Sequence, residues 1–92
     1  MWKVSPGMGR RALDVDAYSL SASIVFERLR VERELSQREM MKGVGMTAVS
    51  RFKGLMEGNT PWNLGDIEKF ANFLGIPIKT AISRIVKESL VG

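Results

Sequence analysis

The sequence contains no cysteine and no histidine among its 92 residues. Without cysteine the protein has no disulfide, no thiolate nucleophile and no cysteine-based zinc site. Without histidine it lacks the commonest general base and the commonest metal-ligating side chain. Carboxylates and lysines are present, but no catalytic constellation is recognisable among them. We therefore expect a protein that is not an enzyme and that binds no metal ion or cofactor.

Long apolar runs are missing as well. No stretch approaches the roughly 20 apolar residues that a membrane-spanning helix needs, and residues 1–11 lack the hydrophobic stretch of a signal peptide. Hydrophobic residues still make up 45% of the chain, an ordinary value for a globular domain. A chain of this length forms a single domain with a modest core. The sequence thus predicts a soluble, cytoplasmic protein.

Acidic residues are outnumbered by basic ones, 10 against 14, for a formal net charge of +4. This balance favours an anionic partner such as nucleic acid or an acidic membrane surface. Much of the excess lies within residues 38–53, where four basic side chains stand against Glu39 alone. The location of the charge therefore marks this segment as a candidate binding surface.

The first 18 residues differ from the rest of the chain. Proline and glycine interrupt any periodicity there, so we interpret residues 1–18 as an N-terminal arm and residues 19–92 as the folded domain. Apolar residues then recur at helical spacing, which predicts a first helix ending near Glu34. Its expected N-cap is one of Ser19, Ser21 and Ser23.

Two short helices should follow. Ser36 and Glu39 have the spacing of a capping box, which predicts a helix over residues 37–42. Glycines at positions 43 and 45 then mark a turn, because glycine is costly inside a helix. The next helix is expected over residues 46–53, continuing towards Glu57. Its inward-facing residues would be Ala48, Val49 and Phe52.

The last third of the chain predicts two more helices. Asn63 and Asp66 form a second N-terminal capping pair, and Gly75 suits the end of the helix that they begin. Pro77 suits the first turn of a final helix with an apolar stripe. Five helices with no competing strand pattern predict an all-α fold.

Two short helices joined by a glycine-containing turn form the outline of a helix-turn-helix motif. Here the sequence resembles the lambda-repressor and Cro-like (XRE-type) DNA-binding domains over residues 24–82. The resemblance implies a compact five-helix lambda-repressor-like domain, with an N-terminal arm outside it. It also implies a sequence-specific transcriptional regulator of the phage or bacterial repressor type. Three stretches carry it, in the correct order: Leu29–Gln37, Gly43–Phe52 and Trp62–Ile76.

The turn departs from the family pattern, because the segment before it is about two residues shorter than usual unless Gly45 fills the turn-glycine position. If Gly43 fills that position, Gly45 caps the third helix. If Gly45 fills it, Thr47 caps the helix, but Arg51 then falls at a core position. We favour the first alternative because burying an unpaired arginine costs several kcal/mol.

The resemblance places the third helix in the major groove of DNA. Methyl and hydroxyl groups on this helix suit contacts to thymine methyls and base edges, and its arginine suits a bidentate contact to guanine. Basic side chains around the motif suit phosphates, and Gln37 matches the family glutamine that touches the backbone from the start of the second helix. The predicted base-contacting residues are Met46, Thr47, Ser50 and Arg51, and the predicted phosphate-contacting residues are Gln37, Arg38, Lys42 and Lys53.

Repressors of this kind commonly bind as two-fold dimers. The final helix carries more apolar residues than an uncovered tail needs. We therefore expect a homodimer on double-stranded DNA at a palindromic operator, without a membrane partner or a small-molecule ligand. The predicted dimer contacts are Ile78, Ile82, Ile85 and Val86.

Alternative functions stay open at this stage. The antitoxin of a toxin–antitoxin pair, which autoregulates its operon, uses the same fold, and so does a phage excision or recombination accessory factor. A protein-interaction module that uses only its apolar surface is the alternative from a different class.

Overall fold

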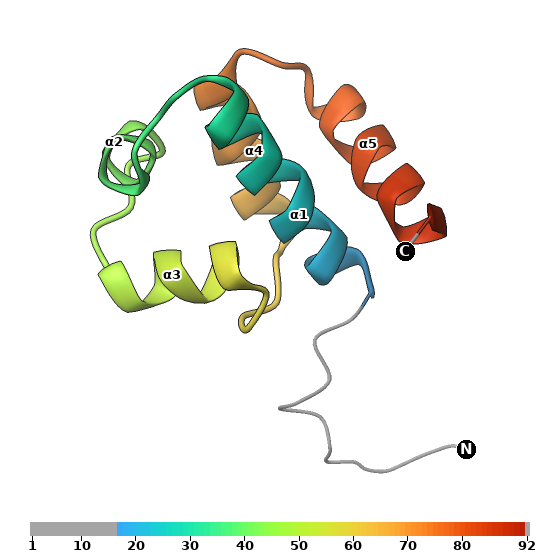
Figure 1. Ribbon diagram of the computed structural model, residues 1–92, viewed down its shortest axis with the longest axis horizontal. Coiled ribbons are helices and arrows are strands. Elements are labelled where there is room, and N and C mark those ends of the chain that lie inside the picture. Colours follow the sequence, from blue (N-terminus) through green and yellow to red (C-terminus); the bar gives the residue numbers. More distant parts are fainter. Residues whose placement is uncertain (1–16, 92) are drawn as a thin grey trace, which may run out of the picture.

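The computed structural model describes residues 17–91, which form five α-helices and no strand, so the predicted all-α fold is confirmed. Helices α1 and α4 lie centrally, with α5 on one side and the α2–α3 pair on the other (Figure 1). Within residues 17–91 no helix is long and apolar enough to cross a membrane. Most of the predicted arm, residues 1–18, lies outside the described residues. The helices are α1 (Ala17–Glu32), α2 (Gln37–Gly43), α3 (Val49–Glu57), α4 (Leu64–Leu74) and α5 (Ile78–Val91).

Helix α1 begins at Ala17, two residues before the predicted start. Ser19, Ser21 and Ser23 therefore lie inside the helix, where all three are buried, and the prediction that one of them caps it is wrong. The physical reason is that the buried face of α1 is wide, because α3 and α5 both pack against this helix. Serine is small enough to fit at the edges of such a face.

Two of these serines and Trp62 form a buried hydrogen-bond network between α1 and the end of α3. The Ser23 hydroxyl and the Trp62 indole Nε1 both donate to the carbonyl of Leu55, at 2.6 and 2.9 Å. The backbone N–H of Trp62 donates to the Ser19 hydroxyl at 2.8 Å. Leu55 lies in the last turn of α3, where carbonyls have no partner within the helix. The network therefore satisfies one of these carbonyls and fixes the end of α3 against α1.

An aromatic cluster forms the centre of the core. The ring of Phe70 in α4 lies 5.3 Å from that of Phe26, 6.0 Å from that of Phe52 and 4.7 Å from that of Trp62, measured between centroids. Phe26 also stacks on Trp62 at 5.0 Å. Such pairs stabilise a core beyond the apolar area that they bury. Because the rings come from α1, α3, α4 and the segment before α4, the cluster holds α3 in place.

Helix α2 begins with the predicted capping box. The Ser36 hydroxyl accepts a hydrogen bond from the Glu39 N–H at 3.0 Å, and the Glu39 carboxylate accepts one from the Ser36 N–H at 2.7 Å. The helix ends at Gly43, against the ring of Phe73 in α4. A Cβ atom at Gly43 would lie 2.1 Å from a carbon of this ring. Glycine therefore allows α2 to approach α4 this closely.

Helix α3 begins at Val49, three residues later than predicted, with Ala48 as its N-cap. The prediction that Gly45 caps this helix is wrong, because Gly45 belongs to the end of α2. Gly45 has a φ of 79°, and its N–H donates to the Lys42 carbonyl at 3.0 Å while the Met46 N–H donates to the Met41 carbonyl at 3.1 Å. This hydrogen-bond pattern is a Schellman motif, which ends a helix with a left-handed residue.

The later start changes which side chains of α3 face inward. Phe52 is buried, as predicted, but Ala48 is exposed and the Val49 side chain is 55% exposed. The prediction that Ala48 and Val49 enter the core is therefore wrong. The extended segment of residues 46–48 separates the two helices, so α3 buries its middle and end rather than its start.

Helices α4 and α5 match the predicted pattern. The Asn63 side chain accepts from the Asp66 N–H at 2.7 Å, the Asp66 carboxylate accepts from the Asn63 N–H at 3.1 Å, and Gly75 ends α4 with a φ of 75°. Helix α5 begins directly after Pro77 and buries Ala81 and Ile85. It packs against both α1 and α4. The last helix is therefore an integral part of the core.

Candidate nucleic-acid interface

The start of α3 is exposed to solvent. The helix buries Phe52, Leu55 and Met56, so its opposite side faces solvent. The exposed residues around its first turn offer methyl, hydroxyl and ammonium groups, which suit the edges of base pairs and the phosphates beside them. These residues are Thr47, Ala48, Val49, Ser50 and Lys53.

The predicted base-contacting residues divide into two groups. Thr47 and Ser50 are exposed beside the start of α3 and in its first turn. Met46 is half-buried and packs against the hydrophobic core, and Arg51 is also half-buried. The structure thus leaves the two hydroxyl groups free to meet a partner, whereas the two longer side chains are partly covered.

The predicted phosphate-contacting residues lie mostly on one side of α3. Gln37, Arg38 and Lys53 line a hollow of about 190 Å³ between α2 and α3. Its other lining residues are Met41, Val49 and Phe52. Lys42 is exposed on α2 but does not line this hollow. We name Gln37, Arg38 and Lys53 the α2 flank.

A second concave surface, of about 410 Å³, lies on the other side of α3, between its start and the start of α4. Lys69 of α4 and Thr47 both line it, and Lys69 was not among the sequence-predicted site residues. Its spacing of three residues from Asp66 places it on the same helix face as that residue, but no sequence signal places it beside the start of α3. We name Asn63, Gly65 and Lys69 the α4 flank.

Arg51 is held by Asp66. The Nη2 atom of Arg51 lies 3.2 Å from Oδ1 and 3.1 Å from Oδ2 of the Asp66 carboxylate. The Asp66 side chain is 7% exposed, whereas that of Arg51 is 39% exposed. Arg51 is thus partly covered but paired, so the cost of an unpaired buried arginine, which decided between the two alternatives for the turn, does not arise here.

The predicted dimer contacts on α5 do not share one surface. Ile85 is 3% exposed and belongs to the core, and Ile78 is half-buried. Ile82 and Val86 are each 38% exposed and lie one turn apart. Of the four residues, Ile82 and Val86 are therefore the two that are exposed.

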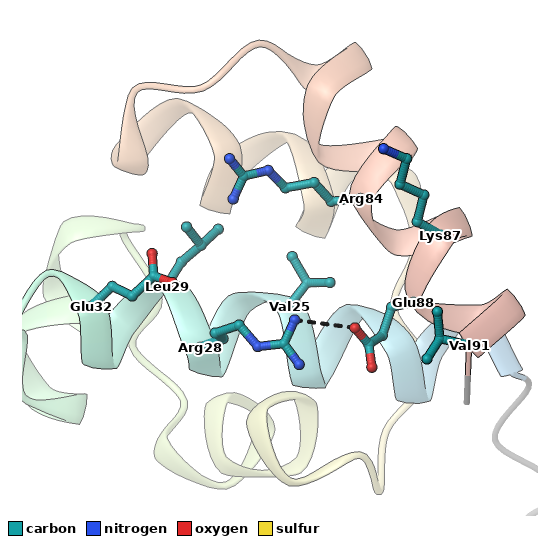
Figure 2. Close-up of a pocket in the computed structure, with 8 residues that line it drawn as sticks. All are labelled: Val25, Arg28, Leu29, Glu32, Arg84, Lys87, Glu88 and Val91. Atoms are coloured by element: carbon teal, nitrogen blue, oxygen red, sulfur yellow. Dashed lines mark hydrogen bonds and ion pairs between the residues drawn. The ribbon is translucent and has the colours of Figure 1, made fainter.

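A hollow of about 200 Å³ lies between α1 and α5 (Figure 2). Val25 and Leu29 are apolar lining residues from α1, and Arg28 forms an ion pair with Glu88 of α5 at 3.1 Å. Figure 2 also shows Arg84 and Lys87 extending from α5. Its lining carries three basic and two acidic side chains, and two of these, Arg28 and Glu88, are paired with each other. This hollow therefore suits phosphates less well than the α2 flank, whose charged residues are both basic.

No protein-family model matches the chain, and no solved structure matches it. Over 55 residues, the chain is 36% identical to the cryptic phage CTXphi transcriptional repressor RstR of Vibrio cholerae. The match covers 60% of this chain and 49% of RstR, so the chain spans about half the length of this curated relative. The chain is therefore similar, over more than half of its own length, to a phage transcriptional repressor.

Proposed function

We propose that this chain is a sequence-specific DNA-binding repressor of the phage or bacterial type, which inserts α3 into the major groove of an operator. The observation that carries the proposal is the exposed first turn of α3 between the α2 flank, which carries Arg38 and Lys53, and the α4 flank, which carries Lys69. Such an arrangement suits a helix in the groove with a phosphate strand on each side. The similarity to a phage transcriptional repressor supports the same function.

The proposed contacts follow from exposure and chemistry. Thr47 and Ser50 donate or accept hydrogen bonds at base edges, and Met46 contacts a thymine methyl group. Lys42 and the α2 flank bind one phosphate strand, and Lys69 of the α4 flank binds the other. Arg51 is not among these contacts, because its guanidinium group is paired within the protein.

The experiment that tests the proposal selects bound fragments from random double-stranded DNA. We expect a recurrent half-site that appears twice, as an inverted repeat with centres about one helical turn, roughly 34 Å, apart. Recovery of fragments without any shared sequence, at every salt concentration tried, would contradict a sequence-specific function.

Lys53→Ala is expected to weaken binding to all DNA sequences and to lower the slope of log affinity against log salt by about 0.9, because one phosphate contact is lost. Affinities measured at several salt concentrations by fluorescence anisotropy give this slope. Lys79→Ala is the matched control, because Lys79 is an exposed lysine on α5 and belongs to neither flank. An equal change of slope in both variants would exclude a specific role for Lys53.

We also propose that two copies associate through the exposed apolar residues of α5, Ile82 and Val86, with Leu90 continuing the same side of the helix. Val86→Lys is expected to weaken this association at least tenfold, because it places a charge in an apolar contact. Sedimentation of the variant across protein concentrations measures the effect. The control is Ser83→Lys, at an exposed position of the same helix. An unchanged dimer in Val86→Lys would rule out this surface.

A further inference from the structure

Arg51 does not present its guanidinium group to a DNA base in this structure. A bidentate contact to guanine needs two N–H groups of the arginine side by side. Nη2 of Arg51 donates to the Asp66 carboxylate, and Nη1 is buried with no hydrogen-bond partner among residues 17–91. Both terminal nitrogens therefore face the protein, so a contact to guanine through them requires the pair with Asp66 to break.

The Asp66 carboxylate both caps α4 and pairs with Arg51. Its Oδ2 atom accepts from the Asn63 N–H at 3.1 Å, which caps α4, and the same oxygen lies 3.1 Å from Nη2 of Arg51. The carboxylate is almost fully buried. Removal of Arg51 would leave this charge without its cationic partner, and charge-assisted hydrogen bonds of this kind are among the stronger contacts in a protein. One carboxylate therefore joins the start of α4 to α3.

The Arg51–Asp66 ion pair lies beside residues that are proposed to contact DNA. Arg51, Asp66, Thr47 and Lys69 line the same concave surface. Thr47, which is proposed to meet a base, and Lys69, which is proposed to meet a phosphate, are carried by different elements. Their separation depends on how α3 is held relative to the start of α4. Among residues 17–91, the Arg51–Asp66 ion pair joins α3 to α4 by side-chain hydrogen bonds.

We infer that Arg51 and Asp66 are positioning residues, which fix α3 relative to α4 so that Thr47 and Lys69 meet a base and a phosphate together. This inference rests on the proposed DNA-binding function. It assigns the reading of bases to the exposed residues at the start of α3, and it removes Arg51 from the predicted set of base-contacting residues.

The test compares Arg51→Ala, Arg51→Lys, Asp66→Asn and the double variant Arg51→Ala/Asp66→Asn against the selected operator and each of its single-base substitutions. We expect Arg51→Ala and Asp66→Asn each to weaken operator binding about tenfold, and the double variant to be no weaker than either alone, as for coupled neighbours. Base discrimination changes in the same way in Arg51→Ala and Asp66→Asn, and Arg51→Ala shows no selective loss at one G·C pair. Arg51→Lys, which keeps a cation for Asp66 but lacks the planar fork of the guanidinium group, retains most of the affinity.

The opposite pattern would overturn the inference. If Arg51 reads a base, Arg51→Ala loses discrimination at one G·C pair, while Asp66→Asn keeps it. Arg28→Ala and Glu88→Gln are the controls, because they break an ion pair of similar length between α1 and α5.

Unfolding by urea, measured without DNA, separates this inference from the proposed function. If the unmodified protein binds no operator, the proposed function fails. The positioning inference still predicts that the effects of Arg51→Ala and Asp66→Asn on the unfolding midpoint are coupled. Additive effects on that midpoint would overturn it, whatever the DNA result.

Discussion

Phe70→Ala is expected to remove most of the stability of the domain. Phe70 is fully buried, and its ring contacts those of Phe26, Phe52 and Trp62. Truncation of a buried phenylalanine costs about 3 to 5 kcal/mol, because apolar contacts are lost and a cavity remains. A domain of this size is stable by roughly 5 to 10 kcal/mol, so the variant should be unfolded or close to unfolding at 37 °C.

Thermal unfolding followed by circular dichroism measures this effect, and we expect the melting temperature to fall by about 15 °C or more. Phe73→Ala is the control, because Phe73 lies on the same helix but is 37% exposed. Its loss should cost roughly 1 kcal/mol. If both variants melted at the same temperature, the aromatic cluster would not be the centre of the core.

Ser50→Glu is expected to abolish operator binding without unfolding the protein. Ser50 is exposed in the first turn of α3, between the two basic flanks. A carboxylate at this position would face the bases and phosphates of the groove, and like-charge contacts across an interface cost several kcal/mol. We expect the affinity for the selected operator to fall by about a hundredfold or more.

Electrophoretic mobility shift measures the loss, and circular dichroism checks that the fold is retained. Ser83→Glu makes the same chemical change at an exposed position of α5 and is expected to leave binding within about twofold. Wild-type affinity in Ser50→Glu would mean that α3 does not enter the groove, and the proposed binding mode would be abandoned.

Local patterns in the sequence predict the fold well where capping chemistry marks the helix ends. The capping boxes of α2 and α4 and the glycine after α4 all lie where the sequence places them. The start of α3 could not be predicted in the same way, because Gly45 suits both the end of one helix and the start of the next. Only the backbone hydrogen bonds to Met41 and Lys42 decide between the two.

The end of α1 could not be predicted from the sequence either. Glu34 adopts the left-handed conformation with a φ of 56°, and the N–H groups of Glu34 and Leu35 donate back to Val31 and Arg30. This position usually belongs to glycine, because other residues meet steric strain there. No local signal distinguishes Glu34 from an ordinary helical glutamate, so the sequence predicted the end of α1 two residues too late.

The sequence predicted the candidate-site residues of the α2–α3 segment but not those contributed by α4. Thr47, Ser50 and the α2 flank follow from the helix-turn-helix pattern, because they are close together along the chain. The pairing of Arg51 with Asp66 joins residues 15 positions apart, across a loop, so it depends on how α3 and α4 pack. The position of Lys69 beside the start of α3 depends on the same packing.

The close approach of Gly43 to Phe73 has a consequence for the evolution of this fold. Any side chain at position 43 would occupy the space that holds the Phe73 ring. A homologue with alanine or a larger residue there must either turn the aromatic ring into water or carry a smaller residue at position 73. These two positions should therefore vary together among related sequences, and an aromatic residue at position 73 that packs against α2 should occur with glycine at position 43.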